Sequence, residues 1–191
     1  VRYIQESGVD GVGGPMHTIG ENYISEVIAI GMSSKFGVGS SSFRTETGRT
    51  KLVDSVPFPA YTRAIIEKVG PYDEELVRNQ DDEYNYRIRA HGGKVLLAAA
   101  VKSTYYSRGS LRKLWRQYFQ YGYWKVRVMQ KHPHQMRPRQ FVPAVFVLGL
   151  IFSLIFSFHP WGRYLLLSIF GMYLLANLAA SLITALRTQL S

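Results

Sequence analysis

The sequence contains no cysteine, and none of its 13 acidic residues lies after Glu83. The absence of cysteine excludes a fold held together by disulfides and is compatible with a reducing compartment. Residues 1–107 hold 12 Lys and Arg against all 13 acids, a net charge of −1, whereas residues 108–191 hold 11 Lys and Arg. The net charge of +10 therefore belongs to the C-terminal part alone.

Two long runs lack charge of either sign. Residues 141–158 are followed, after a linker of sequence HPWGR, by residues 164–186. Runs of this length match the roughly 20 residues that cross a hydrocarbon core about 30 Å thick. We therefore predict a transmembrane helical hairpin over residues 140–187. The alternative is two buried helices of a soluble bundle, but the first run offers only Ser153 and Ser157 as polar positions.

The cations around these runs predict an orientation. Nine Lys and Arg lie in residues 108–139, only Arg163 lies in the linker, and Arg187 follows the second run. Because cationic flanks stay on the cytoplasmic side, residues 1–140 and the C-terminus are expected inside.

The part before the runs has a mixed α/β pattern without internal repeats. Helical spacing covers residues 20–31, a second helix over residues 63–69 ends at Gly70, and the apolar stretch 94–101 is typical of a buried strand. Residues 33–51 are rich in glycine and serine and are expected to form a loop. The chain opens at Val1 without a signal peptide, and it reads as a domain entered partway through.

Three consecutive carboxylates, Asp81, Asp82 and Glu83, stand at the start of a predicted helix over residues 80–90. Asn79 is expected to cap this helix, and carboxylates in a first turn are favoured by the helix dipole. On the residues alone, a helix-start role and a catalytic role both stay open.

The order of motifs around these carboxylates is more specific than each motif alone. A helix with aromatic and basic residues precedes a Gly-x-Tyr-Asp-Glu turn, an acidic helix start, an arginine and Gly-Gly-Lys. This order resembles the C-terminal half of the GT-A catalytic domain of family 2 glycosyltransferases, of the membrane-anchored exopolysaccharide type. The resemblance covers about residues 9–130. Its motifs are carried by Gly70, Tyr72, Asp73, Glu74, Leu76, Gln80, Asp81, Asp82, Glu83, Arg87, Gly92, Gly93 and Lys94.

The resemblance implies inverting glycosyl transfer, in which a base takes the proton of the attacking acceptor hydroxyl. It assigns this role to Asp81, with Asp82 as the second candidate, although Gln80 stands where the family often has Glu. Asp82 and Glu83 are expected near the substrate. Glu83 and Arg87 also have the i,i+4 spacing of a routine surface pair.

The family's Asp-x-Asp motif, which holds Mg²⁺ or Mn²⁺ against the diphosphate of a nucleotide sugar, occurs nowhere in this sequence. The cation's ligands and most of the nucleotide pocket are therefore expected before Val1, and the chain alone is expected to have little or no activity. The five histidines show no metal-ligand spacing.

Residues 108–139 predict a basic amphipathic helix that lies in a membrane interface against anionic headgroups. At 100° per residue, the apolar side of this helix consists of Leu111, Leu114, Trp115, Tyr118, Gly122, Val126 and Met129. The opposite side holds Arg112, Lys113, Arg116 and Arg127. Lys125 falls on the apolar side and fits neither an interfacial nor a substrate-binding role.

The resemblance also implies residues that bind substrate at the mouth of the active site, where cations would stabilise the departing diphosphate or a lipid-linked acceptor. A loop arginine after the Gly/Ser-rich stretch is a further candidate. These residues are Arg44, Arg112, Arg116, Gln117, Tyr118 and Trp124.

The sequence thus predicts three parts: residues 1–107, the acceptor-side half of a GT-A domain; residues 108–139, an interfacial segment; and residues 140–187, the hairpin. The expected function is transfer of a sugar from a nucleotide-sugar donor to a lipid-linked or polysaccharide acceptor. The expected location is the inner membrane, as a multi-pass protein with a cytoplasmic catalytic part. The alternative is a non-catalytic, membrane-anchored adaptor that binds anionic lipid or a partner protein. Nucleic-acid binding is not expected, because the cations abut the membrane runs.

Overall fold

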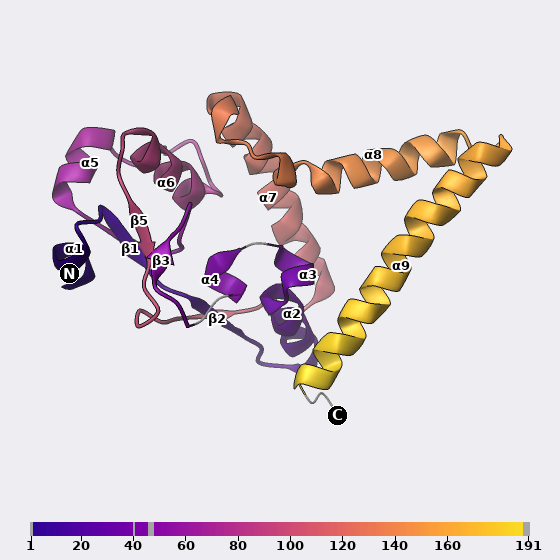
Figure 1. The fold of residues 1–191 in the computed structure, drawn as a ribbon, viewed down its shortest axis with the longest axis horizontal. Coiled ribbons are helices and arrows are strands. Elements are labelled where there is room, and N and C mark those ends of the chain that lie inside the picture. The colour runs from indigo at the N-terminus through magenta and orange to yellow at the C-terminus, as the bar shows by residue number, and fades with distance from the viewer. Residues whose placement is uncertain (1, 40, 46–47, 189–191) are drawn as a thin grey trace. The chain divides into compact units, whose positions relative to one another are not determined.

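A computed structural model describes residues 2–39, 41–45 and 48–188. The chain divides into two compact units, Val1–Pro133 and His134–Ser191. The first unit contains both sheets and is mixed α/β, as the sequence predicts, whereas the second is helical (Figure 1).

The elements of the first unit follow in a fixed order. They are α1 (Arg2–Ser7), β1 (Gly11–Gly13), β2 (Met16–Ile19), α2 (Tyr23–Ser33), α3 (Lys35–Val38), α4 (Ser42–Thr45), β3 (Lys51–Leu52), β4 (Ala60–Tyr61), α5 (Arg63–Val69), α6 (Gln80–Ala90), β5 (Val95–Leu97), β6 (Ser103–Tyr106) and α7 (Leu111–Lys131). The second unit has α8 (Val142–Ile155) and α9 (Pro160–Thr188), and short 3₁₀ turns at Pro133–Gln135 and Pro138–Gln140 precede α8.

The main sheet has four strands in the order β3-β5-β1-β4. The central strands β1 and β5 are parallel, with Val12 opposite Leu96, and both edge strands are antiparallel to their neighbours. Every residue of β1 and β5 is buried, because both faces of the sheet are covered. Strands β2 and β6 form a separate parallel pair.

The two faces of the main sheet carry two apolar clusters. On one face, Ile65 of α5 and Tyr84 and Ile88 of α6 pack against Val95 and Leu97 of β5. The other face is covered by α1, in a cluster formed by Val9, Val12, Leu96 and Ala98 with Tyr3 and Ile4. Helix α6 is therefore fixed to the sheet along one side, and its acidic N-terminal end has a defined position.

The helices around the acidic stretch begin and end where their sequence signals predict. Helix α5 spans Arg63–Val69 and ends at Gly70, whose φ of 83° is favourable for glycine. Helix α6 spans Gln80–Ala90. The buried strand is shorter than expected, since β5 has three residues, and the Gly/Ser-rich segment contains the short helices α3 and α4.

Of the two predicted membrane spans, the structure shows one candidate. In the part of the chain that the structure describes, α9 is the one helix that is long and apolar enough to cross a membrane, and none of its apolar window is buried. Helix α8 has 14 residues and rises about 21 Å at 1.5 Å per residue, short of a core about 30 Å thick. The chain turns after Ile155, and a side chain at Gly162 would collide with the Phe156 carbonyl oxygen, 1.9 Å from the ideal Cβ.

Candidate active site

Helix α6 begins with an unusual residue. Asn79 has φ 65° and ψ 18°, the left-handed conformation, and its side chain makes no hydrogen bond to the helix. The expectation that Asn79 caps α6 through its side chain is therefore wrong. Its amide nitrogen instead donates to the backbone oxygen of Tyr121 in α7, at 3.1 Å. This bond ties the start of α6 to the middle of α7, so the acidic stretch lies against α7.

Asp81 lies in the first turn of α6 and is partly buried. Its carboxylate accepts a hydrogen bond from the backbone N–H of Phe58 and a long one, 3.5 Å, from the Tyr72 hydroxyl. It also lines a hollow formed by Tyr72, Asp73, Glu74, Leu76, Gln80 and Asp81. Asp81 is thus held from two sides and still borders an open space that a ligand can enter.

Burial raises the pKa of Asp81 above its usual range, and the negative charge of Asp82 acts in the same direction. The bonds from Phe58 and Tyr72 lower that pKa, because they stabilise the ionised form, but burial has the larger effect. A carboxylate with a raised pKa is a better proton acceptor than an ordinary surface aspartate. The group suits the role of a general base.

Tyrosine side chains extend the surroundings of Asp81 into the core. The Tyr72 ring stacks on Tyr84 with centroids 4.3 Å apart, and the Tyr61 hydroxyl bonds to Tyr72 and to Asn85 Oδ1, the latter at 3.1 Å. Sequence reasoning used Tyr72 only as part of a turn motif and missed Phe58 and Tyr61. The local signal for Phe58 was its position between two prolines, in the segment VPFPAY.

Asp82, the second candidate base, is engaged by a cation. Its Oδ2 accepts from Lys125 Nζ of α7 at 2.5 Å. Lys125 was the residue that fitted no predicted role of the amphipathic segment. Its position on the apolar side of the helical pattern is explained by this pair, which joins α7 to the start of α6.

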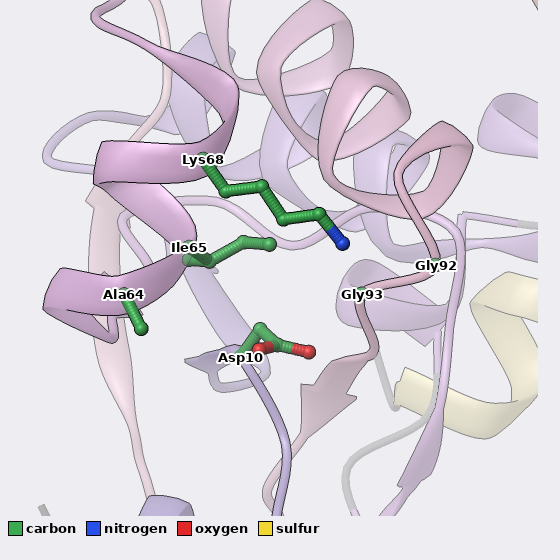
Figure 2. A pocket seen from close by; sticks show the side chains of 6 residues that line it. All are labelled: Asp10, Ala64, Ile65, Lys68, Gly92 and Gly93. Carbon is green, nitrogen blue, oxygen red and sulfur yellow. The ribbon is translucent and has the colours of Figure 1, made fainter.

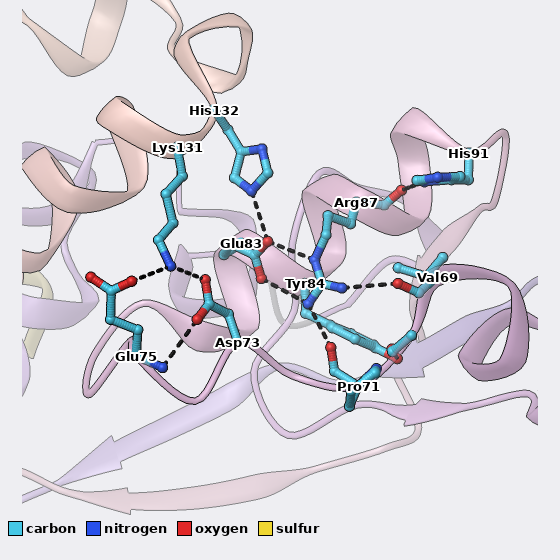
Figure 3. Close-up of polar contacts among 11 residues, drawn as sticks. Val69, Pro71, Asp73, Glu75, Glu83, Tyr84, Arg87, His91, Lys131 and His132 are labelled. Atoms are coloured by element: carbon cyan, nitrogen blue, oxygen red, sulfur yellow. Dashed lines mark hydrogen bonds and ion pairs between the residues drawn. The ribbon is translucent and has the colours of Figure 1, made fainter.

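Glu83 is fully buried, with a side-chain exposure of 0%. Its Oε1 bonds to Arg87 Nε at 2.6 Å and to His132 Nε2 at 2.9 Å, as Figure 3 shows. Arg87 also donates to the backbone oxygens of Val69 and Pro71, at 3.0 and 2.9 Å. The prediction of a routine surface pair is wrong, since this pair is internal. The other prediction is that Glu83 lies near the substrate. A fully buried carboxylate gives that prediction no support.

A second set of ion pairs holds the turn before α6 against the end of α7. Lys131 pairs with Asp73 and with Glu75, the latter at 2.6 Å, and Arg127 pairs with Glu75 at 2.5 Å (Figure 3 shows those of Lys131). Hydrogen bonds from these cations hold the pKa of Asp73 and that of Glu75 below their usual ranges. The turn that borders the Asp81 hollow is therefore fixed at both ends, by Arg87 and by α7.

Helix α7 contacts the rest of its unit through a mainly polar stripe rather than through its apolar side. The contacting positions recur at helical spacing and are Gln117, Tyr121, Lys125, Val128 and Lys131. The exposed side carries large apolar residues, which are Leu111, Trp115, Tyr118, Phe119, Tyr123 and Val126. Among the described residues of the first unit, most of the predicted apolar side of α7 is thus exposed, with Leu114 and Met129 half-buried.

Three of the predicted substrate-binding residues lie near Tyr105 and Tyr121. They are Arg44, Gln117 and Tyr118. The Arg44 guanidinium lies 5.3 Å from the ring centre of Tyr105 and donates to Thr18 Oγ1 at 3.2 Å. Burial lowers the pKa of Arg44, and the nearby Tyr105, Tyr118 and Tyr121 act against that shift. Gln117 is buried and donates to the hydroxyls of Tyr105 and Tyr121, at 3.1 and 2.9 Å.

The remaining predicted residues form no hydrogen bond or ion pair with Asp81 within the described ranges. Arg112 and Arg116 are exposed on α7, and in the described ranges neither forms an ion pair. Trp124 is partly buried and packs edge-on against Tyr123, with ring centres 5.4 Å apart. Their expected roles at the mouth of the site remain predictions.

A smaller hollow lies elsewhere on the first unit (Figure 2) and is lined by Asp10, Ala64, Ile65, Lys68, Gly92 and Gly93. Its polar groups serve the fold: Asp10 Oδ2 accepts from the Lys94 N–H at 2.8 Å, and Lys68 Nζ donates to the His91 backbone oxygen at 2.7 Å. We therefore centre the candidate site on Asp81.

The described residues do not fit a divalent cation. Among them, no group of three or more His, Asp or Glu side chains is placed to hold a metal ion. Near Asp81, the carboxylates of Asp82 and Glu83 are instead paired with Lys125, Arg87 and His132.

Two curated proteins match the chain. The succinoglycan biosynthesis protein ExoA of Rhizobium meliloti is 30% identical over 162 residues, which cover 81% of this chain and 46% of the relative. The dolichyl N-acetyl-alpha-D-glucosaminyl phosphate 3-beta-D-2,3-diacetamido-2,3-dideoxy-beta-D-glucuronosyltransferase of Methanococcus voltae is 29% identical over 128 residues, or 66% of this chain and 39% of the relative. No protein-family model matches the chain, and no solved structure matches it.

These relatives confirm the class that the motif order predicted: the chain is a glycosyltransferase homologue. One of the two relatives is named for succinoglycan biosynthesis, in keeping with the resemblance to transferases of the exopolysaccharide type. The chain spans less than half the length of the relatives that it matches, 46% and 39%.

Proposed function

We propose that this chain forms the acceptor-side half of a GT-A catalytic domain in an inverting glycosyltransferase. Asp81 acts as the general base: its carboxylate takes the proton of an acceptor hydroxyl while that oxygen attacks the anomeric carbon of a nucleotide sugar. The nucleoside diphosphate leaves from the opposite face of the sugar. The acceptor is a lipid-linked sugar or a growing polysaccharide.

One observation carries this proposal. Asp81 is the carboxylate of the acidic stretch that borders an open hollow and forms no ion pair with a cation among the described residues, whereas Asp82 and Glu83 are paired with Lys125 and Arg87. A base must be within reach of the acceptor hydroxyl and must not be neutralised by a fixed cation. The functions for which the relatives are named, succinoglycan biosynthesis and glucuronosyl transfer, support a sugar nucleotide as donor.

The family resemblance implies Mg²⁺ or Mn²⁺ for the full-length enzyme. The described residues do not fit such an ion, so none of them is proposed as its ligand.

Membrane attachment completes the proposal. Helix α9 has the length and composition of a membrane span, and α7 exposes aromatic residues such as Trp115 and Phe119 beside the cations Arg112 and Arg116. Such a helix favours an interface with anionic lipid. We propose an inner-membrane, multi-pass protein with its catalytic part cytoplasmic. The same helix supports the alternative, a non-catalytic adaptor that binds anionic lipid.

A transfer assay with the full-length protein separates enzyme from adaptor. We expect membranes containing it to move radiolabelled sugar from one member of a nucleotide-sugar panel into lipid-extractable or polymeric product, and EDTA to abolish this transfer. Membranes without the protein are the control. Absence of transfer from every donor, with binding to anionic vesicles retained, would favour the adaptor.

The pKa of Asp81 predicts the pH dependence of transfer. Because burial raises this pKa, the acid limb of kcat/KM should lie at higher pH than for an ordinary aspartate, and activity should fall as pH decreases through it. Replacing Tyr72 with phenylalanine removes a hydrogen bond to the ionised form, so the limb should move to still higher pH. Tyr3→Phe, on the opposite face of the sheet, is the matched control. An unchanged limb in Tyr72→Phe would argue against Asp81 as the group that titrates.

A further inference from the structure

Two strained residues flank the Asp81 carboxylate. Within residues 2–39, 41–45 and 48–188, Phe58 and Asn79 are the only residues other than glycine with a positive φ. Their φ angles are 47° and 65°. The N–H of Phe58 bonds to Asp81, and Asn79 is two positions before it. Such conformations are costly for residues other than glycine, and most of all for a bulky one, and they concentrate at functional sites.

The strain at Phe58 is imposed by its surroundings. The buried Asn85 side chain donates to Ser55 Oγ and to the Val56 backbone oxygen, both at 3.1 Å, so the segment before Phe58 is fixed to α6. Pro57 and Pro59 on either side further restrict the backbone.

The held backbone turns an aromatic ring outward. Phe58 is 70% exposed, although burying a phenylalanine side chain would stabilise the fold by about 1.5–3 kcal/mol. Tyr72, the other residue that bonds to the Asp81 carboxylate, is 40% exposed. One carboxylate beside an open hollow is thus contacted by Phe58, which is largely exposed, and by Tyr72, which is partly exposed and stacks on Tyr84. A strained, exposed ring does not stabilise the fold, which points to a ligand.

We propose that the Phe58 ring is a stacking platform for a hexopyranose ring of the acceptor. A pyranose has an apolar face of C–H groups and an edge of hydroxyls. The electron-rich face of an aromatic ring attracts the weakly positive C–H groups, while a hydroxyl at the edge of the same sugar reaches the Asp81 carboxylate. Phe58 would thereby select an acceptor with a flat C–H face and orient its hydroxyl toward the base. This inference rests on the proposed function, since it takes the sugar beside Asp81 to be the acceptor.

Saturation-transfer difference NMR on the 191-residue chain in nanodiscs tests the contact directly. The probes are methyl β-D-glucopyranoside and methyl β-D-galactopyranoside, with glycerol as a ligand that has hydroxyls but no ring. We expect the ring C–H protons of at least one glycoside to receive saturation, and the Phe58→Asn variant to lose most of it, about threefold or more. Phe58→Trp should retain it. Tyr23→Asn, which removes another exposed aromatic ring, should also retain it.

Thermal unfolding distinguishes a ligand platform from a structural ring. Asparagine tolerates a positive φ better than phenylalanine does, so Phe58→Asn should leave the melting temperature unchanged or raise it. A lowered melting temperature, equal saturation in wild type and Phe58→Asn, or no saturation in the wild type would each overturn the proposal. The two proposals also fail separately, because NMR reads sugar contact without turnover. Contact without transfer would leave Phe58 as a sugar-binding ring but remove the transferase and with it the acceptor role of that sugar. Transfer without contact would leave the transferase and overturn the platform.

Discussion

Replacing Asp81 with asparagine is expected to lower sugar transfer by the full-length protein about 10²- to 10⁴-fold, the usual contribution of a general base. Asparagine keeps the size of the side chain and an oxygen that can accept from the Phe58 N–H, but it cannot take a proton. The loss should appear in kcat and in kcat/KM alike, because proton transfer belongs to the transition state.

The neighbouring carboxylate supplies the matched control. Asp82→Asn removes a charge one residue away and breaks a partly exposed pair with Lys125, a change of about 0–1 kcal/mol in stability. It should retain most of the activity. Equal losses of transfer activity in the two variants would mean that the acidic residues only stabilise the start of α6. Loss of activity in Asp82→Asn alone would assign the role of base to Asp82.

The same pKa shift predicts how Asp81→Asn affects stability. A carboxyl group whose pKa is raised on folding binds its proton more tightly in the folded state. Its contribution to stability therefore falls as pH rises from the ordinary aspartate range through the raised value. At neutral pH the ionised Asp81 disfavours folding, so Asp81→Asn should melt at the same or a higher temperature. A lower melting temperature would indicate a structural role and weaken any kinetic result.

Features set by short-range signals could be predicted from the sequence. Helices α5 and α6 have their expected bounds because glycines with φ of 83°, Gly70 and Gly92, stop or follow them. The acidic start of α6 could be recognised by its composition, and the order of motifs indicated the class. These features depend on residues within a few positions of each other.

Contacts between segments far apart in the chain could not be predicted in this way. Lys125 and Asp82 are separated by 43 positions, and His132 and Glu83 by 49. Such contacts depend on how α7 packs against α6, which neither helix pattern specifies. A lysine that did not fit the amphipathic pattern was the one local indication of the first contact. The burial of Glu83 had no local indication, because its i,i+4 spacing with Arg87 is identical in surface helices.

Replacing Glu83 with alanine is expected to lower the free energy of unfolding of the first unit by about 3–5 kcal/mol, the usual cost of leaving one partner of a buried pair unpaired. Glu83 is 0% exposed and Arg87 18%, and both Arg87 and His132 would lose their carboxylate. Arg87 would then hold the carbonyls of Val69 and Pro71 less firmly, so the turn beside Asp81 should loosen too. Pulse proteolysis across a urea series, with the chain in nanodiscs, measures this change.

A second glutamate in the same unit provides a control with matched geometry. Glu67 also pairs with an arginine at i,i+4, Arg63, at 2.8 Å, but these side chains are 63% and 92% exposed. An exposed pair contributes about 0.3–0.5 kcal/mol, so Glu67→Ala should be nearly neutral. Spacing and residue types are the same, while the order of the two residues is reversed and Glu83 has His132 as a second partner. Reversing the order changes such a pair by only a few tenths of a kcal/mol, so a larger difference reports the burial and the second partner of Glu83. If Glu83→Ala cost no more than Glu67→Ala, the pair of Glu83 with Arg87 would be dispensable, and the position of the turn before Asp81 would have to depend on Lys131 and Arg127 of α7 instead.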